Sequence, residues 1–131
     1  MMPSPPIEGD FGEGAFGPTI LLRLPTHAAA AHLRELFGWL ATQPSGTMLN
    51  LVGQPGFRIA ASIWSFRIGV REGTGGQRLV SDPEGFTWLG DPEEWTTTAL
   101  LVDPLTRQPG HQYLTDETLD DAIVEVSCGE Y

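Results

Sequence analysis

The clearest hydrophobic pattern in the chain lies between His27 and Thr42 and predicts an amphipathic helix. Its apolar residues recur at positions i, i+3, i+4 and i+7, which puts Leu33, Leu36, Phe37 and Leu40 on one helical face. Thr26 is a suitable N-cap, and the Pro-Ser-Gly sequence at 44–46 ends the helix. The apolar run 19–24, closed by Pro25, predicts a buried strand directly before this helix.

Alternating apolar residues predict further strands in the middle of the chain. Residues 47–52 form one expected strand, a turn follows at 53–56, and 57–71 is rich in residues that favour strands. The alternation within 57–71 changes phase near Ser62, which predicts a bulge or bend there. Trp64 alternates with the apolar residues Phe66, Ile68 and Val70 in the second half of this segment, so we expect its side chain in the core.

Glycine-rich and acidic segments punctuate the rest of the chain. The loop 72–77 predicts a hairpin that returns through 78–81, and 86–89 is a further expected strand. Asp91-Pro-Glu-Glu94 carries the signals of a helix start. The β-branched residues after it favour one helical turn and then a strand, with a continued helix as the alternative.

The last segments are expected to begin with a loop over 103–112. A second helix-start pattern lies at 115–118, and 119–127 keeps helical spacing while ending in β-branched residues. We expect a short helix that passes into a final edge strand over 123–127, although 116–127 can be read as helix or strand.

Together these elements predict an α+β fold: a mixed or antiparallel sheet of five to six strands, with one main amphipathic helix packed on one face. The chain has 131 residues, the size of one ordinary domain. Residues 1–18 are rich in proline and glycine and are expected to form a flexible arm, followed by a single α+β domain over 19–131.

Charge is distributed unevenly. The chain has 7 basic and 17 acidic residues and a net charge of −10, and all seven basic residues are arginine, so chemistry that requires lysine is excluded. Residues 1–78 contain six arginines and five acids, whereas 79–131 contain one arginine and twelve acids. Such an acidic half repels phosphate backbones and attracts basic proteins, so we expect a basic protein partner and no nucleic acid.

Cysteine usage and the N-terminus indicate a cytoplasmic protein. Cys128 is the single cysteine, so no intramolecular disulfide is expected. The first 18 residues lack the basic and apolar regions of a signal peptide, and no apolar run is long enough to cross a bilayer. We therefore expect no association with a membrane.

No catalytic motif is complete. The sequence Gly12-x-Gly14-x-x-Gly17 lacks the preceding strand and following helix of a dinucleotide site. His27 and His32 lie on different sides of the predicted helix, so no metal site is expected. A nucleophilic pair of Cys128 and His111 is formally available, but nothing near the cysteine activates it. We expect no cofactor and no catalytic residue.

Acidic residues at the two predicted helix starts are the candidate partner-binding residues. They include a tryptophan, because aromatic residues beside acids are common at binding hot spots. The set is Asp91, Glu93, Glu94, Trp95, Asp116, Glu117, Asp120 and Asp121. Trp39, which lies off the apolar stripe of the first helix, is a further candidate for an exposed contact.

Three functions are compatible with these features. The leading hypothesis is a non-catalytic protein-binding module, in its most concrete form a bacterial immunity or antitoxin-type inhibitor. It would mask a basic partner, such as a toxin enzyme, through the acidic C-terminal half. The second is a structural or assembly subunit of a phage or secretion apparatus, and the third is a small enzyme or ligand-binding module with a pocket between helix and sheet. A homo-oligomer is compatible with each.

Overall fold

The computed structural model describes residues 5–72, 77–115 and 120–129, and it has a mixed α/β architecture with two helices and two sheets. One sheet has five strands in the order β4 (Phe57–Ile59), β1 (Ile7–Gly14), β2 (Gly17–Leu24), β9 (Ile123–Cys128) and β8 (Gly110–Tyr113). The other has four strands in the order β3 (Met48–Asn50), β5 (Phe66–Val70), β7 (Gly85–Gly90) and β6 (Arg78–Asp82). The five-stranded sheet fits the prediction, whereas a single main helix on one face is not confirmed.

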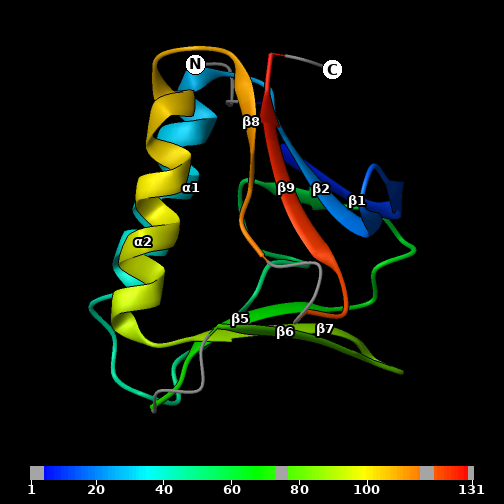
Figure 1. The fold of residues 1–131 in the computed structure, drawn as a ribbon, viewed down its shortest axis with the longest axis vertical. Helices are drawn as coiled ribbons and strands as arrows, with labels where there is room; N and C mark the ends of the chain where they lie inside the picture. The colour runs from blue at the N-terminus through cyan, green and yellow to red at the C-terminus, as the bar shows by residue number, and fades with distance from the viewer. Residues whose placement is uncertain (1–4, 73–76, 116–119, 130–131) are drawn as a thin grey trace.

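The helices α1 (His27–Leu40) and α2 (Pro92–Val102) lie side by side, and the 3-10 helix η1 (Asp103–Thr106) follows α2. Figure 1 shows the helices on one side of the molecule, the five-stranded sheet on the other, and β5, β6 and β7 across the bottom. The helices therefore cover one face of the five-stranded sheet and leave its other face uncovered by any helix.

The strand–helix pair β2–α1 forms as predicted. Thr26 caps α1, its side-chain oxygen accepting a hydrogen bond from the Ala29 N–H at 3.0 Å. The helix ends at Leu40, two residues before the expected end. Its buried residues include Leu33, Phe37 and Leu40 from the predicted apolar stripe.

The prediction that residues 1–18 form a flexible arm is wrong for 7–14. This segment is strand β1, which pairs antiparallel with β2 across a tight turn at Ala15 and Phe16. Gly17 has a φ of 114°, a conformation that glycine adopts at little cost and that closes the turn. The glycine and proline content suggested a linker, but backbone pairing with β2 orders this segment.

Strand β9 is an interior strand of its sheet, so the predicted edge strand is also corrected. It pairs in parallel with β2 and antiparallel with β8, and all six of its residues are buried. The apolar run that predicts a final strand fits this interior position. The expected helix before it is not observed at the described residues 120–122, and 116–119 lie outside the described residues.

Helix α2 continues through 96–102, where a strand was expected. The hydroxyls of Thr96 and Thr98 donate to carbonyl oxygens one turn earlier, and Trp95, Thr98 and Val102 bury one face of the helix. Packing of this face against the core overrides the weak strand preference of the three consecutive threonines. Residues 103–112, expected as loop, contain η1 and the start of β8.

The phase change near Ser62 marks a passage between sheets rather than a bulge. Strand β4 belongs to the five-stranded sheet and β5 to the four-stranded sheet, so the chain turns between them. Trp64 lies in that turn and is 76% exposed, which corrects its expected core position. The predicted hairpin across 72–77 is also wrong, because β6 pairs with β7 and not with β5.

Aromatic residues fill the core between the helices and the two sheets. Trp88 of β7 and Trp95 of α2 are fully buried, with ring centroids 4.9 Å apart, and Phe37 of α1 stacks on Trp95 at 5.5 Å. The Trp95 Nε1–H donates to the Gly69 carbonyl at 2.9 Å. Trp95 is therefore a core residue and not an exposed contact, whereas Trp39 is exposed as expected.

Candidate functional site

The first predicted acidic cluster caps helix α2. The Asp91 side chain accepts from the Glu94 N–H and the Glu94 side chain accepts from the Asp91 N–H, each at 2.8 Å. This reciprocal capping box uses both carboxylates within the chain. With Trp95 buried, Glu93 is the one exposed member of this cluster.

The described members of the second predicted cluster, Asp120 and Asp121, are hydrogen-bonded to an edge strand. The Asp120 side chain accepts from the Leu79 N–H at 2.6 Å, and the Asp121 side chain accepts from the Ser81 N–H at 2.7 Å. These carboxylates occupy backbone donors of β6 at the edge of the four-stranded sheet. Asp116 and Glu117 lie outside the described residues. Within the described chain, no hydrogen bond or ion pair joins the two predicted clusters.

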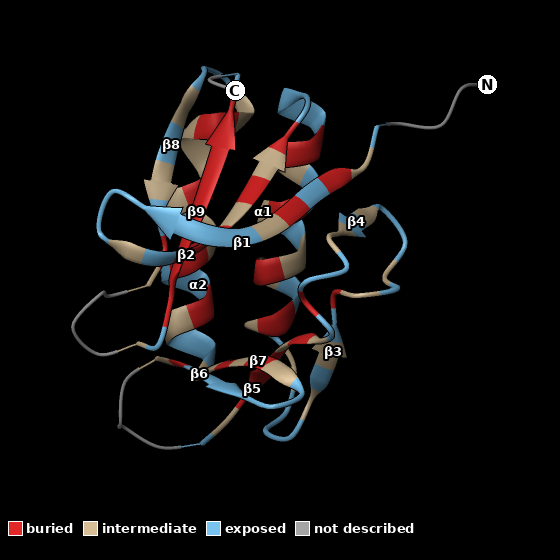
Figure 2. Cartoon of the chain, turned by 90° about the vertical axis from the view of Figure 1, so that its right-hand side faces the viewer, coloured by how far each residue is buried: buried red, intermediate tan, exposed pale blue. Residues whose placement is uncertain are grey.

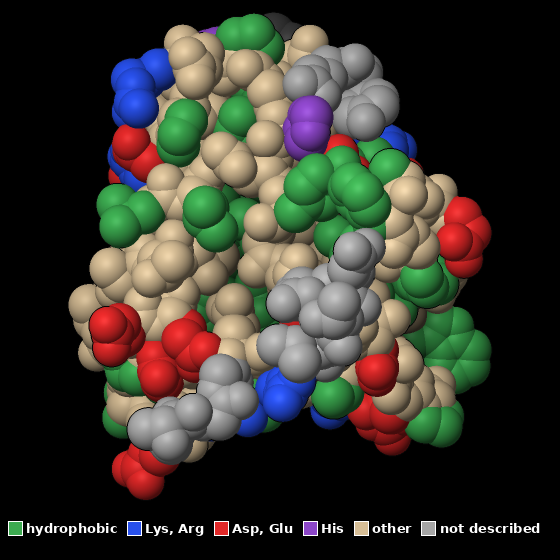
Figure 3. All heavy atoms as spheres, in the orientation of Figure 1, with side chains coloured by type: hydrophobic (Ala, Val, Ile, Leu, Met, Phe, Trp, Pro, Cys, Tyr) green, Lys and Arg blue, Asp and Glu red, His purple; other side chains and the backbone are tan. Residues whose placement is uncertain are grey.

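On the face of the molecule seen in Figure 3, the acidic side chains of the described residues lie in several separate groups. Several described acids of residues 79–131 therefore have local structural roles: some cap helix α2, and others bind the edge strand β6.

The cysteine lies beside a histidine other than the one expected. Cys128 Sγ is 3.7 Å from His27 Nδ1, but the same nitrogen is 2.8 Å from the Leu105 carbonyl oxygen. A carbonyl only accepts, so Nδ1 carries the proton and has no lone pair to receive one from the thiol. Burial also raises the pKa of the Cys128 thiol. This pair is not an activated nucleophile. His111 is paired with Ser127 in the sheet, so it lies on the same face as Ser127 and on the other face from Cys128.

The open face of the five-stranded sheet gathers polar residues from four strands. We call it the outward sheet face, and Figure 2 shows it toward the viewer. Strand register places on it Glu8, Asp10 and Gly12 of β1, Thr19, Leu21 and Arg23 of β2, Ile123, Glu125 and Ser127 of β9, and His111 and Tyr113 of β8. The alternate residues of the same strands, such as Leu22 and Val126, are buried in the core.

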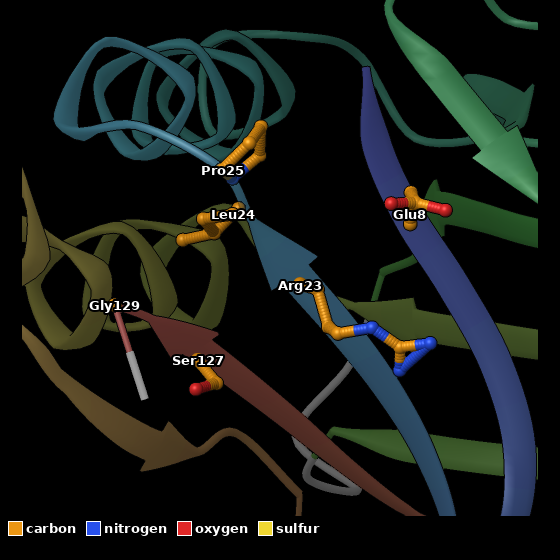
Figure 4. A pocket seen from close by; sticks show the side chains of 6 residues that line it. All are labelled: Glu8, Arg23, Leu24, Pro25, Ser127 and Gly129. Carbon is orange, nitrogen blue, oxygen red and sulfur yellow. The ribbon is translucent and has the colours of Figure 1, made fainter. Parts of the chain in front are cut away.

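One hollow on this face, the Ser127 notch, has a volume of about 240 Å³. Figure 4 shows its lining residues: Glu8, Arg23, Leu24, Pro25, Ser127 and Gly129. Ser127 is 3% exposed, and its buried hydroxyl has no hydrogen-bond partner. The Arg23 side chain extends toward β1, where its guanidinium pairs with Asp10 at 2.5 Å.

A second hollow, the Glu125 notch, lies beneath the β1–β2 hairpin and has a volume of about 280 Å³. Figure 2 shows β1 crossing in front of the lower part of β9. The ring of Phe16 at the hairpin turn contacts the Tyr113 ring edge-on at 5.4 Å, which joins the hairpin to β8. The lining is Asp10, Gly12, Glu13, Gly14, Ala15, Thr19, Leu21, Tyr113 and Glu125.

Glu125 is the least ordinary residue of this notch. It is 8% exposed, and its carboxylate makes no hydrogen bond or ion pair with any residue that the structure describes. Sequence reasoning missed Glu125 and Ser127, although two polar residues in alternation within the apolar run 123–128 are a signal that one side of the strand serves another purpose.

The face as a whole can attract cations. Glu8, Glu13 and Glu125 make no ion pair among the described residues, and Arg23 is already paired with Asp10. Across residues 5–72, 77–115 and 120–129, no group of three or more histidine, cysteine or acidic side chains is arranged to hold a metal ion.

A separate apolar hollow lies between α1 and the start of β1. Its volume is about 360 Å³, and it is lined by Pro5, Ile7, Ala28, Ala29, His32, Pro55 and Gly56. This hollow lies between helix and sheet, where the ligand-binding hypothesis expected a pocket, and it contains no carboxylate.

Comparison with known proteins identifies no relative. A scan against protein-family models, a search of curated proteins and a search of solved structures each found no match. In the part of the chain that the structure describes, neither helix is long and apolar enough to cross a membrane.

Proposed function

We propose that this protein is a non-catalytic binding module whose outward sheet face holds a basic segment of a protein partner. The supporting observation is the charge of that face: the carboxylates of Glu8 and Glu125 make no ion pair among the described residues, and Asp10 already neutralises the one arginine. A surface of this kind steers a basic partner toward it and fixes the orientation of binding.

The geometry favours this face over the acidic C-terminal half as such. The carboxylates of Asp91, Glu94, Asp120 and Asp121 accept hydrogen bonds from backbone N–H groups of the same chain. Reversal of their charge would disturb α2 and β6 directly. The carboxylates of Glu8 and Glu13 are exposed and make no such bond within the described chain.

The concrete form that we propose is a cytoplasmic immunity or antitoxin-type inhibitor that masks the basic surface of a toxin enzyme. Enzymes that act on nucleic acid carry positive surfaces for phosphate, and an acidic face competes for them. The absence of an activated nucleophile at Cys128 agrees with a binding role. Residues 7–14 pair with β2 as strand β1, so they are not the free arm on which the assembly-subunit hypothesis depended.

A pair of double variants tests the proposal. Glu8→Arg with Glu13→Arg reverses two exposed charges of β1, one on the outward sheet face and one in the lining of the Glu125 notch. Glu35→Arg with Glu93→Arg makes the same charge change on exposed positions of α1 and α2. The partner is first captured on immobilised protein, with the product of the adjacent gene as the first candidate, and its affinity is then measured by calorimetry.

The face variant should bind at least about tenfold more weakly, equivalent to ~1.4 kcal/mol, and the helix variant should bind nearly as the parent protein does. Binding of the parent should also weaken as ionic strength rises, because exposed charges are screened. An equal loss of affinity in both variants would mean that binding depends on net charge alone. An unchanged affinity of the face variant would mean that the partner binds another surface.

A further inference from the structure

Glu125 is a largely buried acidic residue of the outward sheet face with no ion pair among the described residues. It lies on the interior strand β9, between β2 and β8, and is 8% exposed. Its nearest cationic neighbour in strand register is Arg23, which faces Ser127 and pairs with Asp10. The charge of Glu125 is therefore available to a ligand group that enters the notch.

The notch around Glu125 is built for a cation. Its lining includes three acidic residues, Asp10, Glu13 and Glu125, of which Asp10 already pairs with Arg23, and it includes no basic residue. The hairpin covers the notch from one side, and Tyr113 forms the wall on β8, in contact with Phe16. Water is therefore partly excluded, which strengthens the attraction between a carboxylate and an incoming cation.

The dimensions favour an organic cation over a metal ion. The volume of about 280 Å³ has room for several waters, each of which takes roughly 30 Å³ in the liquid. The three carboxylates are not arranged as a metal-binding group within the described residues. A guanidinium is planar, pairs with carboxylates through two parallel hydrogen bonds and stacks on aromatic rings such as that of Tyr113.

We propose that the Glu125 notch binds the guanidinium group of an arginine side chain, with Glu125 as the carboxylate that receives it. The inference rests on the proposed function for the source of this arginine, which is an exposed residue of the basic protein partner. Glu13 also lines the notch, and Leu21 contacts the aliphatic part of the bound side chain.

The test uses the full chain and two short blocked peptides, Gly-Arg-Gly and Gly-citrulline-Gly, in a titration followed by amide NMR. Citrulline has nearly the shape of arginine and carries no charge. The arginine peptide should shift the resonances of Leu21, Tyr113 and Glu125 in a saturable manner at low salt, and the citrulline peptide should not.

The variant Glu125→Gln keeps the shape of the side chain and should weaken the arginine peptide at least about tenfold. Glu35→Gln on α1 is the matched control and should bind as the parent does. Glu13→Gln, on the exposed hairpin, provides a second test if Glu125→Gln does not fold, and it should also weaken binding. Equal binding of citrulline, or parent-like binding by Glu125→Gln or Glu13→Gln, would overturn the inference.

Failure of this inference can be distinguished from failure of the proposed function. If Glu125→Gln retains full affinity for the captured partner while Glu8→Arg with Glu13→Arg loses it, the partner uses the face without the arginine subsite, and this inference is overturned. If the arginine peptide binds and depends on Glu125 while no basic protein binds the face, the notch is confirmed and the proposed function is wrong.

Discussion

Two hydroxyl groups on neighbouring strands show how single residues of the outward sheet face differ. Ser127 on β9 has a buried hydroxyl with no partner, whereas the Thr19 hydroxyl on β2 donates to the Gly17 carbonyl at 2.9 Å. Both residues are buried on the same face of the sheet. An unsatisfied buried polar group destabilises the fold, and a satisfied one stabilises it modestly.

The exchange Ser127→Ala should therefore raise the free energy of unfolding by about 1 kcal/mol, since it removes an unsatisfied group. Thr19→Val has nearly the same shape as threonine and should lower it by ~1 kcal/mol, because it removes a bonded hydroxyl. Urea unfolding followed by tryptophan fluorescence measures both. Destabilisation by Ser127→Ala would show that its hydroxyl contributes to the native fold.

Residue type alone does not tell which tryptophan is exposed. Trp64 follows an apolar alternation yet is exposed, because the alternation continues across a turn between two sheets. Trp95 follows an acidic cluster yet is buried, because Asp91 and Glu94 cap the helix while the next residue faces inward. In each case the deciding contact is made with residues distant in sequence, which local patterns do not contain.

At the scale of elements, the N-terminus of α2 illustrates what the sequence can predict. Asp91-Pro-Glu-Glu94 predicts the start of a helix, and the capping box forms there. How far the helix continued was not predictable from the threonines, since the burial of Trp95, Thr98 and Val102 in the tertiary fold decides it. The same holds for β1 and β9, where pairing partners determine whether a segment is an arm, an edge or an interior strand.

Removal of the cap by Asp91→Ala should lower the free energy of unfolding by about 1 kcal/mol, because the Glu94 N–H loses its acceptor. The matched control is Glu93→Ala in the same helical turn, where the side chain is exposed and the expected change is within ~0.5 kcal/mol. Thermal unfolding by circular dichroism measures both variants. If Asp91→Ala is silent, the capping hydrogen bond contributes nothing in solution.

The whole molecule combines a large net charge with a core cluster of apolar residues. The chain has a net charge of −10, and the described ion pairs are partly exposed contacts of arginine with aspartate or glutamate. Such pairs stabilise a fold little. Repulsion among the remaining acids therefore opposes compaction, and the burial of apolar residues in the core outweighs it.

Salt should for this reason act in opposite directions on stability and on binding. Between roughly 10 mM and 150 mM ionic strength the screening length falls from about 30 Å to about 8 Å. The free energy of unfolding in urea, a neutral denaturant, should increase over this range because self-repulsion is screened. The affinity for a basic partner and for the arginine peptide should decrease over the same range, because their attraction to the outward sheet face is screened too. A fall in the free energy of unfolding with salt would mean that the ion pairs stabilise the fold more than repulsion among the acids destabilises it. The acidity would then be part of the fold, and its use in binding a partner would lose its physical basis.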